Sequence, residues 1–251
     1  MRSKLVGLCF ILTAYVVFLV ITLPAKLALS YLPLPPQVVI SQVTGTVWHG
    51  HAEKVSYDNI DVIDFVWDTS FITMLTGSIE ANVQFGRGKS SLRGHGDVGY
   101  SSNGGYAKNV TVEANSEWLL MASNIPVPVT TSGEVKLEVS EAQQGQPWCE
   151  QLSGKLTWSN AGIQSLIGNI MVDSAVADLS CESGALVANI KQASSQLRLS
   201  GIAKLAAENK YSLSAVLVPS NELPESIRTN LRYIGKPNAK GEYQLNYSGR
   251  I

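Results

Sequence analysis

The chain opens with one uninterrupted apolar run, and the remainder alternates apolar and polar positions over short distances. The run covers Leu5–Leu23 and contains no charged residue. At a rise of about 1.5 Å per residue, a helix of this length just crosses the hydrocarbon core of a bilayer. Arg2 and Lys4 precede the run, and only Lys26 follows it closely. Positive charge stays on the cytoplasmic side, so the pattern predicts a cytoplasmic start over residues 1–4 and a single transmembrane anchor.

A cleaved signal peptide is the alternative interpretation of this run. The apolar core of a signal peptide is usually shorter, and small residues flank its cleavage site. Ala25-Lys26-Leu27 does not have that pattern, so we favour an uncleaved anchor. Residues 24–36 then form a spacer. Its end, Tyr31–Pro36, reads Y-L-P-L-P-P and cannot continue a helix, because proline lacks the backbone N–H.

Residues 37–251 show the two-residue period of β-strands. In Gly133–Val139, the residues Val135, Leu137 and Val139 alternate with charged residues, which is typical of a half-buried strand. Similar runs are found at 38–48, 60–67, 77–85, 106–114, 152–158, 184–190, 195–200, 211–217 and 243–247. Glycine-punctuated strands at this spacing favour an antiparallel architecture.

Few segments have the pattern of a helix. In Pro224–Ile234, an apolar face recurs at helical spacing, with proline in the first turn and Gly235 after the last. Shorter helical turns are expected at Ser70–Leu75 and Ser116–Ala122. The predicted fold class is therefore mainly β: an N-terminal transmembrane helix followed by an antiparallel sheet with a few short helices. The pattern leaves a partly open barrel, a sandwich and a groove as alternatives.

One short motif occurs twice. Val43–Trp48 and Leu152–Trp158 each place a glycine before a β-run that ends in tryptophan, and the polar stretch Glu141–Pro147 lies between them. The exported domain, residues 37–251, could thus consist of two similar halves with a boundary near 145. Turn-and-strand chemistry alone also explains such an echo.

The charge balance excludes nucleic acid as an expected partner. The 19 basic residues fall to 17 outside the anchor once Arg2 and Lys4 are removed, against 20 acidic residues, which leaves −3. No block of Lys and Arg forms the footprint that a phosphate backbone requires.

Cysteine and tryptophan provide the structural candidates. Cys149 and Cys181 lie in the exported part, where thiols oxidise, so we predict a disulfide between them; two unpaired buried thiols are the alternative. Trp48, Trp67 and Trp158 are candidate core residues or partner contacts, because tryptophan buries a large area and is frequent in interface hot spots.

No catalytic or cofactor site is predicted. His49 and His51 share one face of a strand and could ligate a metal only if a third ligand approached, so two solvated side chains are the favoured interpretation. Gly86–Ser91 resembles a phosphate loop, but the required first glycine is replaced by Val83, and a turn is favoured. The spaced aspartates between 58 and 68 lack the glycine of a calcium loop. No G-x-S-x-G elbow occurs.

Several segments, in this order, carry a family resemblance. They are L-P-A-K-L-A-L at 23–29, V-T-G-T-V-W-H-G-H-A at 43–52, C-E-Q-L-S-G-K-L-T-W at 149–158, D-L-S-C-E-S-G-A-L-V-A at 178–188, Y-S-L-S-A-V-L-V-P-S-N-E-L-P at 211–224 and L-R-Y-I-G-K-P-N-A-K-G-E-Y-Q-L at 231–245. Together with the N-terminal anchor, the set resembles the general secretion pathway protein N family of type II secretion systems.

The resemblance implies a non-enzymatic inner-membrane component with a periplasmic domain. Such a protein assists the export of folded proteins across the outer membrane, and its expected partners are the inner-membrane platform proteins and the secretin. The start of the exported domain also loosely resembles AsmA-type proteins, whose β groove binds lipid. Lipid binding is therefore the alternative function, and neither resemblance implies a cofactor or a metal.

Overall fold

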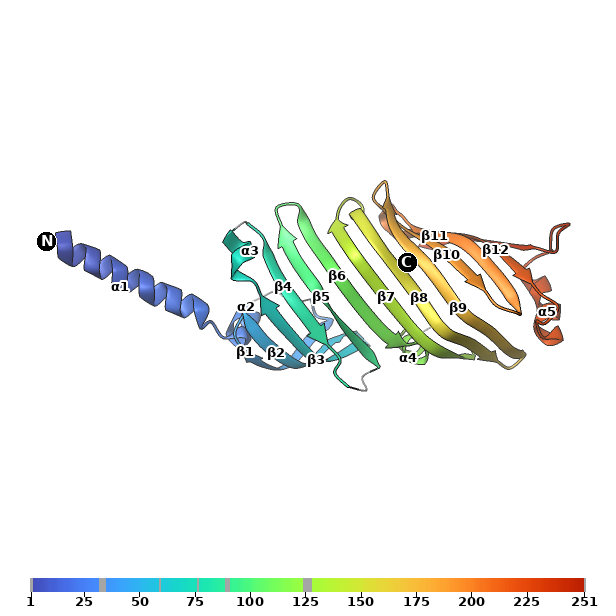
Figure 1. Cartoon of the computed structure of the whole chain (residues 1–251), viewed down its shortest axis with the longest axis horizontal. Coiled ribbons are helices and arrows are strands. Elements are labelled where there is room, and N and C mark those ends of the chain that lie inside the picture. The colour runs from blue at the N-terminus through green and yellow to red at the C-terminus, as the bar shows by residue number, and fades with distance from the viewer. Residues whose placement is uncertain are drawn as a thin grey trace.

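The exported part of the chain forms one curved antiparallel sheet. The computed structural model describes residues 2–31, 35–58, 60–75, 77–88, 91–123 and 128–250. Within these residues, thirteen strands pair in the order in which they occur in the chain, so each strand neighbours the one before it and the one after it (Figure 1). The strands are β1 (Val38–Gly45), β2 (His49–Tyr57), β3 (Ile60–Thr69), β4 (Ile79–Phe85), β5 (Leu92–Ser101), β6 (Gly104–Asn115), β7 (Val129–Gln144), β8 (Cys149–Ser165), β9 (Gly168–Glu182), β10 (Ala185–Ala193), β11 (Leu197–Leu205), β12 (Lys210–Pro219) and β13 (Tyr243–Arg250).

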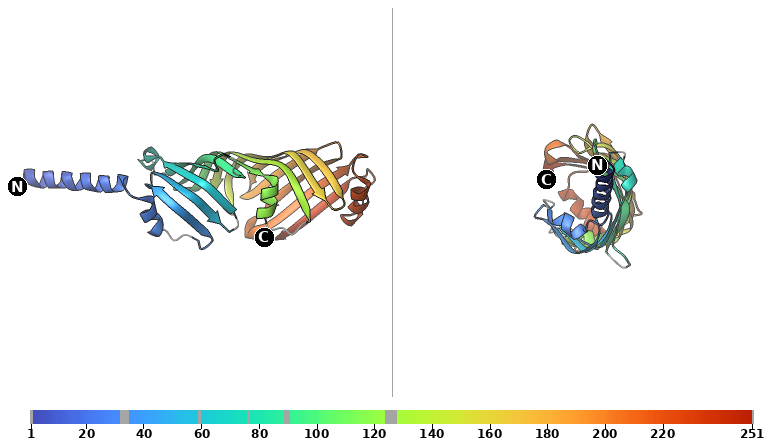
Figure 2. Two further views of the ribbon diagram at one scale, coloured as in Figure 1. Left: turned by 90° about the horizontal axis from the view of Figure 1, so that it is seen from below. Right: turned by 90° about the vertical axis from the view of Figure 1, so that its left-hand side faces the viewer.

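The helices lie at the ends and edges of the sheet, and all except α1 are short. They are α1 (Arg2–Ile21), α2 (Ala25–Tyr31), α3 (Phe71–Leu75), α4 (Ser116–Ala122) and α5 (Glu225–Asn230), with single 3₁₀ turns at Ala207–Asn209 and Leu231–Tyr233. The apolar α1 projects away from the sheet at one end, and α5 lies at the other (Figure 2). Both predicted short helical turns and the predicted C-terminal helix are therefore present, the last in a shorter form that starts after Pro224.

The predicted membrane anchor is not supported. In the described part of the chain, no helix combines the length and the hydropathy needed to cross a membrane. The predicted spacer also contains a helix, since Leu27 and Ala28 donate backbone hydrogen bonds to the Pro24 carbonyl and so open α2. Residues 32–34 of the spacer lie outside the described residues.

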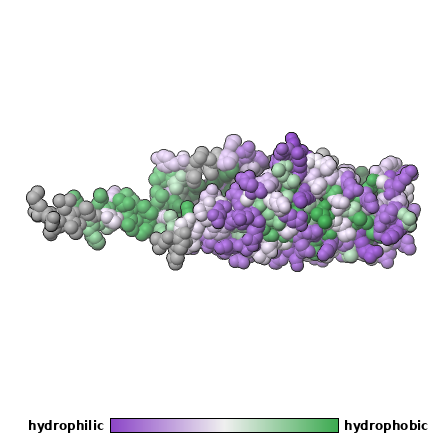
Figure 3. Space-filling model, turned by 90° about the horizontal axis from the view of Figure 1, so that it is seen from above, coloured by the Kyte–Doolittle hydropathy of each residue, from purple (hydrophilic) through white to green (hydrophobic). Residues whose placement is uncertain are grey.

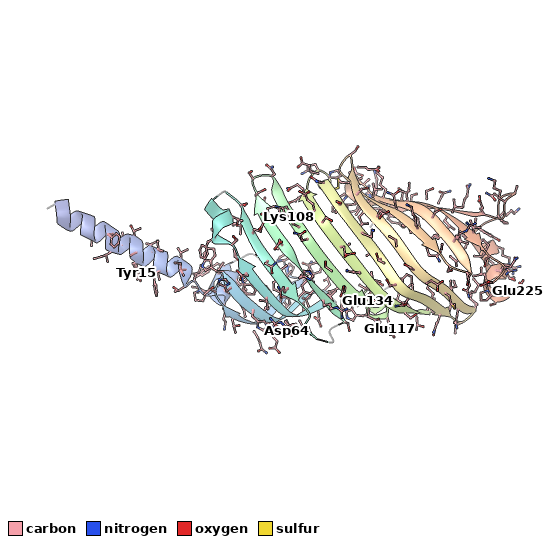
Figure 4. All side chains as sticks on the ribbon, in the orientation of Figure 1. Tyr15, Asp64, Lys108, Glu117, Glu134 and Glu225 are labelled. Carbon is pink, nitrogen blue, oxygen red and sulfur yellow. A yellow bond between two sulfur atoms is a disulfide. The ribbon has the colours of Figure 1, made fainter. Side chains whose placement is uncertain are left out.

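The two faces of the sheet differ in chemistry. On one face, register places Val110 opposite Val139, and Val139 opposite Gly154. The adjacent row on the other face pairs Thr111 with Glu138, and Glu138 with Lys155. The polar row is convex, with Lys108 and Glu134 on the side that Figure 4 labels, and the sheet curls around its apolar face (Figures 2 and 4). The sequence left a partly open barrel, a sandwich and a groove as alternatives. The described strands form one open, curled sheet, so they are not a sandwich of two sheets.

The apolar face is closed at one end by α5. Leu197, Leu223, Ile227 and Leu231 form a buried cluster there, and Leu199, Leu217 and Tyr243 of the sheet pack against it. The periodicity of the Pro224 segment predicted Ile227 and Leu231 on one face, and both are buried. Elsewhere the sheet has no second layer, and no large side chain of the described residues is completely buried.

Strand prediction failed where the apolar face carries glycine or alanine. No strand was predicted at 92–101 or 168–182, where β5 and β9 lie, and the first predicted strand, which ran to about residue 48 and carried His49 and His51 on its exposed face, is divided into β1 and β2. A turn over Thr46–Trp48 separates β1 from β2. Gly50, Gly94 and Ala177 occupy apolar-face positions in the missed strands, so the periodic signal of large apolar side chains is weak. The proposed boundary near 145 falls in the turn between β7 and β8, and the division into two halves stays a prediction.

The predicted disulfide is formed. The Cys149–Cys181 bridge joins the start of β8 to the end of β9 across a separation of 32 residues, and Cys149 is almost fully buried. Since β8 and β9 also pair with each other, the bridge holds the open end of that hairpin together.

We expect the double substitution Cys149→Ala/Cys181→Ala to lower the free energy of unfolding by about 3–4 kcal/mol, because the reduced chain regains the entropy of a loop of this length. Urea unfolding of the full chain in detergent, followed by tryptophan fluorescence, measures the change. Reducing the unsubstituted protein should produce a similar loss, whereas Cys9→Ala should not. Equal midpoints for the double variant and the unsubstituted protein would refute the expectation.

Candidate functional site

The first notable site is the junction between the N-terminal helices and the sheet. Trp48 lies in the turn between β1 and β2 with only 7% of its surface exposed. Its Nε1 donates to the Val20 carbonyl at 2.8 Å, and its ring stacks on Phe71 with centroids 3.9 Å apart. The backbone N–H of Val47 donates to the Leu23 carbonyl at 3.1 Å. The indole of Trp48 therefore fastens the end of α1 to the sheet.

The other candidate tryptophans make comparable contacts. Trp67 Nε1 donates to the Val47 carbonyl at 3.0 Å, and its indole lies over Gly50 on the neighbouring strand. Trp158 Nε1 donates to the Ser132 carbonyl at 3.0 Å. Both side chains are half-buried on the apolar face of the sheet. A fourth tryptophan, Trp148, is more exposed, and its Nε1 donates to the Ala206 carbonyl at 2.7 Å.

The histidines and aspartates lie on β2 and β3 as exposed pairs. His49 Nδ1 is 3.1 Å from an Asp68 carboxylate oxygen, and His51 Nε2 is 3.5 Å from Asp64. Lys54 pairs with Asp61 at 2.8 Å. In the described residues, no three His, Cys, Asp or Glu side chains come together as a metal site would require.

Local backbone geometry explains why Asp61, Asp64 and Asp68 of β3 all reach side chains of β2. Asp64 has a φ of 51°, in the left-handed region, so the strict alternation of β3 is interrupted there. The Lys54 ammonium, and then the Ser56 hydroxyl, hydrogen-bond to Asp61 and hold the pKa of that carboxyl below its usual value. All of these groups are solvated, and such pairs contribute little to stability.

A second polar cluster lies where α4 meets β5, β6 and β7. Arg93 donates to Glu113 at 2.7 Å and to Glu134 at 2.5 Å. These two carboxylates, with the hydrogen bond to Glu113 as the largest effect, raise the pKa of the Arg93 guanidinium. A cavity of about 610 Å³ beside this cluster is also lined by Glu117 and Trp118, and Figure 4 labels Glu117 and Glu134 near each other. Arg93 is the one cation among the residues that line this cavity, and it bridges two of the three carboxylates.

The suspected phosphate loop is a turn in its described part. Gly86 and Gly88 both have positive φ, and the Gly86 N–H donates to the Ile63 carbonyl. Residues 89–90 of this motif lie outside the described residues.

The two ends of the sheet differ as free edges. Among the described strands, β1 pairs only with β2, and β13 pairs only with β12. The edge of β1 is interrupted at Gln42, whose φ is 51°, and Thr46 beyond it bridges to Pro24. β13 has a regular register with β12 from Tyr243 to Arg250, and its residues 243–249 carry no charge and no proline. Neither β1 nor these residues of β13 have the charge or proline that usually protects an edge strand, and β13 is uninterrupted, so β13 is the better template for another strand.

The concave face holds an apolar groove between β8 and β13. It is lined mainly by leucines, alanines and two tyrosines from successive strands. Its chemistry contrasts with the hydrophilic surface that covers much of the sheet in Figure 3, where apolar side chains appear on α1 and in patches. The periodicity of the sequence predicted apolar positions on single strands. It could not predict the groove, because the groove depends on how residues of six strands lie next to one another.

Comparison with known proteins identifies the family. The family model described as "Type II secretion system (T2SS), protein N" matches residues 36–246. The chain belongs to this family. It is 31% identical to the type II secretion system protein N of Aeromonas hydrophila over the full length of both chains. Identity to the protein of that name from Vibrio cholerae serotype O1 is 32% over 95% of each chain, and to that from Pectobacterium carotovorum 29% over 100% of this chain and 99% of the relative. No solved structure matches.

The matched region is the sheet itself, from just before β1 to within β13, and it contains the disulfide pair. The resemblance that the sequence motifs indicated is therefore confirmed at the level of the family. The general role that follows is that of a component of a type II secretion system in the bacterial envelope.

Gly50→Ala tests the packing under Trp67. An added Cβ would lie 2.0 Å from Cζ2 of the Trp67 indole, so the ring must move and its bond to the Val47 carbonyl is lost. We expect the free energy of unfolding to fall by about 1–3 kcal/mol, with a change in the near-ultraviolet circular dichroism of the tryptophans. Gly235→Ala, where nothing lies within 4 Å of the added atom, is the control. An unchanged spectrum and midpoint for Gly50→Ala would show that the indole is not packed there.

Proposed function

We propose that this protein is a non-enzymatic accessory component of the type II secretion system that assists export of folded proteins from the periplasm across the outer membrane. Its partners are other inner-membrane platform proteins and the secretin, and it acts on them through protein–protein contacts. Support comes from the family match over nearly the whole sheet. The polar clusters of the described residues pair basic with acidic side chains on an open surface, as at His49–Asp68 and Arg93–Glu113.

We also propose that α1 associates with the inner membrane, with the chain start in the cytoplasm and the sheet in the periplasm. The large apolar side chains of α1 from Phe10 to Ile21 are about half to three-quarters exposed, and they require an apolar environment. The Cys149–Cys181 disulfide fits the oxidising periplasm.

One observation carries the proposed contact: the unprotected outer edge of β13. Its backbone offers a row of N–H and C=O groups with no neighbouring strand among the described residues. An extended segment of a partner can add to such an edge, with main-chain hydrogen bonds for affinity and alternate side chains for specificity. Gln244, Asn246 and Ser248 along it are exposed and neutral.

In-cell photo-cross-linking tests this contact. A photoreactive residue at Gln244 should yield adducts with other secretion components in cells that assemble the system. The same residue at Ser153, exposed on the convex face of the interior strand β8, should yield few. If the gene is deleted without any effect on secretion and Gln244 gives no adduct, the proposed function is wrong.

Positive charge placed on the β13 edge should weaken the proposed contact. We expect Gln244→Lys/Ser248→Lys to reduce secretion in a complemented deletion strain by about tenfold, because charge on an edge strand opposes the addition of another strand. Secreted protein in the culture medium is the readout. The matched variant Ser153→Lys/Ser159→Lys adds the same charge to exposed positions of an interior strand and should secrete normally. Equal secretion by the two variants would exclude the β13 edge as the contact.

A further inference from the structure

The apolar groove on the concave face is separate from the β13 edge and goes beyond the protein contacts proposed above. Its cavity measures about 670 Å³, within the range of small-molecule sites. Residues from six successive strands line it, among them Leu152, Leu179, Leu186, Ala188, Ala203 and Leu213.

Small residues create the depression. Register places Ala188 of β10 directly opposite Ala203 of β11. The pair is flanked in the same row by Leu179 of β9 and Leu213 of β12. Two adjacent alanines between two leucines leave a floor that is lower than its sides, and the curl of the sheet raises the sides further (Figure 2).

The wall of the groove has no charge to offer a ligand. Its uncharged polar side chains are Ser212, Tyr211 and Tyr247, and the two tyrosines are 40% and 53% exposed. Lys204 also borders the cavity, but it alternates with the lining residues Ala203 and Leu205, and its Nζ lies 3.9 Å from Glu182. The complement to this wall is an uncharged apolar group, because burying a charge here would leave it unpaired.

The geometry excludes an extended peptide as the occupant. Strands β8–β12 are paired on both sides, so their backbone groups cannot satisfy an extended peptide laid across the concave face. A flexible hydrocarbon chain has no backbone polar groups, so it needs no hydrogen bonds from this wall.

We propose that this groove binds the acyl chains of a membrane phospholipid. The chains lie along the floor formed by Ala188 and Ala203, against Leu179 and Leu213. The headgroup stays in water at the open side, where Tyr211 and Tyr247 are exposed and their hydroxyls are in reach of it. Tyrosine suits this position, since its ring is apolar and its tip is polar.

The test uses the purified full chain in an amphipathic polymer and a phosphatidylglycerol that carries one pyrene-labelled acyl chain. Pyrene fluorescence should show saturable binding, and unlabelled phosphatidylglycerol should compete. Among short-chain competitors, each added methylene should strengthen binding by up to about fourfold, as expected for chains that leave water. Absence of saturable binding would overturn the proposal.

A matched pair of variants assigns the binding to the groove. Ala203→Trp fills the floor, whereas Ile202→Trp places the same indole one residue away, at a position that is 51% exposed on the convex face. We expect the first to weaken binding by about tenfold or more and the second by less than about twofold. Leu213→Trp, on the neighbouring strand, should act like Ala203→Trp. Circular dichroism and an intact disulfide verify that each variant folds.

Other results identify other occupants. Equal binding by all variants would show that the probe associates with α1 or the polymer, and the proposal would be wrong. A change of oligomeric state with Ala203→Trp and no competition by phospholipid would instead assign the groove to a second copy of the chain. Because lipid binding is measured on purified protein, its failure is distinct from a failure of the β13 edge to support secretion.

Discussion

The whole structure depends on how a single-layered sheet removes one apolar face from water. Two-layered domains cover such a face with a second sheet or with helices. Here α1 projects away from the sheet and the other described helices are short and lie at its ends or edges. The thirteen strands therefore cover the apolar face mainly by curling around it. The result is a face of half-buried side chains in place of a dense core, and only the α5 cluster is packed from both sides. Stability must therefore come largely from strand pairing and from local clasps.

Three local contacts reinforce the sheet, one near each end and one between β8 and β9. Trp48 fastens the N-terminal helices to the first hairpin through its stacking on Phe71 and its bond to the Val20 carbonyl. The Cys149–Cys181 bridge closes the end of the β8–β9 hairpin. At the far end of the sheet, Leu223 and Ile227 cover the apolar face by packing against Leu217 and Tyr243. The first and last of these contacts tie a helical segment to the sheet and the second joins two strands, which leaves the concave surface between them open for a ligand.

Much of the local structure could be predicted from the sequence because it depends on local interactions. Alternation at Val135, Leu137 and Val139 is a property of seven consecutive residues, and β7 contains them. The same holds for α4, whose start at Ser116 is capped by the Asn115 side chain. β5 and β9, and the extent of β2 beyond His51, were not predicted because their apolar-face positions include glycine and alanine, which carry no periodic signal. Those small residues are required by large neighbours on the adjacent strand, such as Trp67 over Gly50 and Phe85 over Gly94.

By itself, the sequence determined the family, the all-antiparallel class, the cysteine pair and the positions of α3, α4 and α5. It could not determine whether the sheet closes, which edge stays free or where the groove lies. Curvature is the sum of many cross-strand contacts between a small residue on one strand and a larger one on the next, and a linear pattern does not contain the pairing that aligns them. The groove depends on Ala188 meeting Ala203 in register, and β13 is an edge only because no strand follows it in the sheet. Tertiary structure alone decides both.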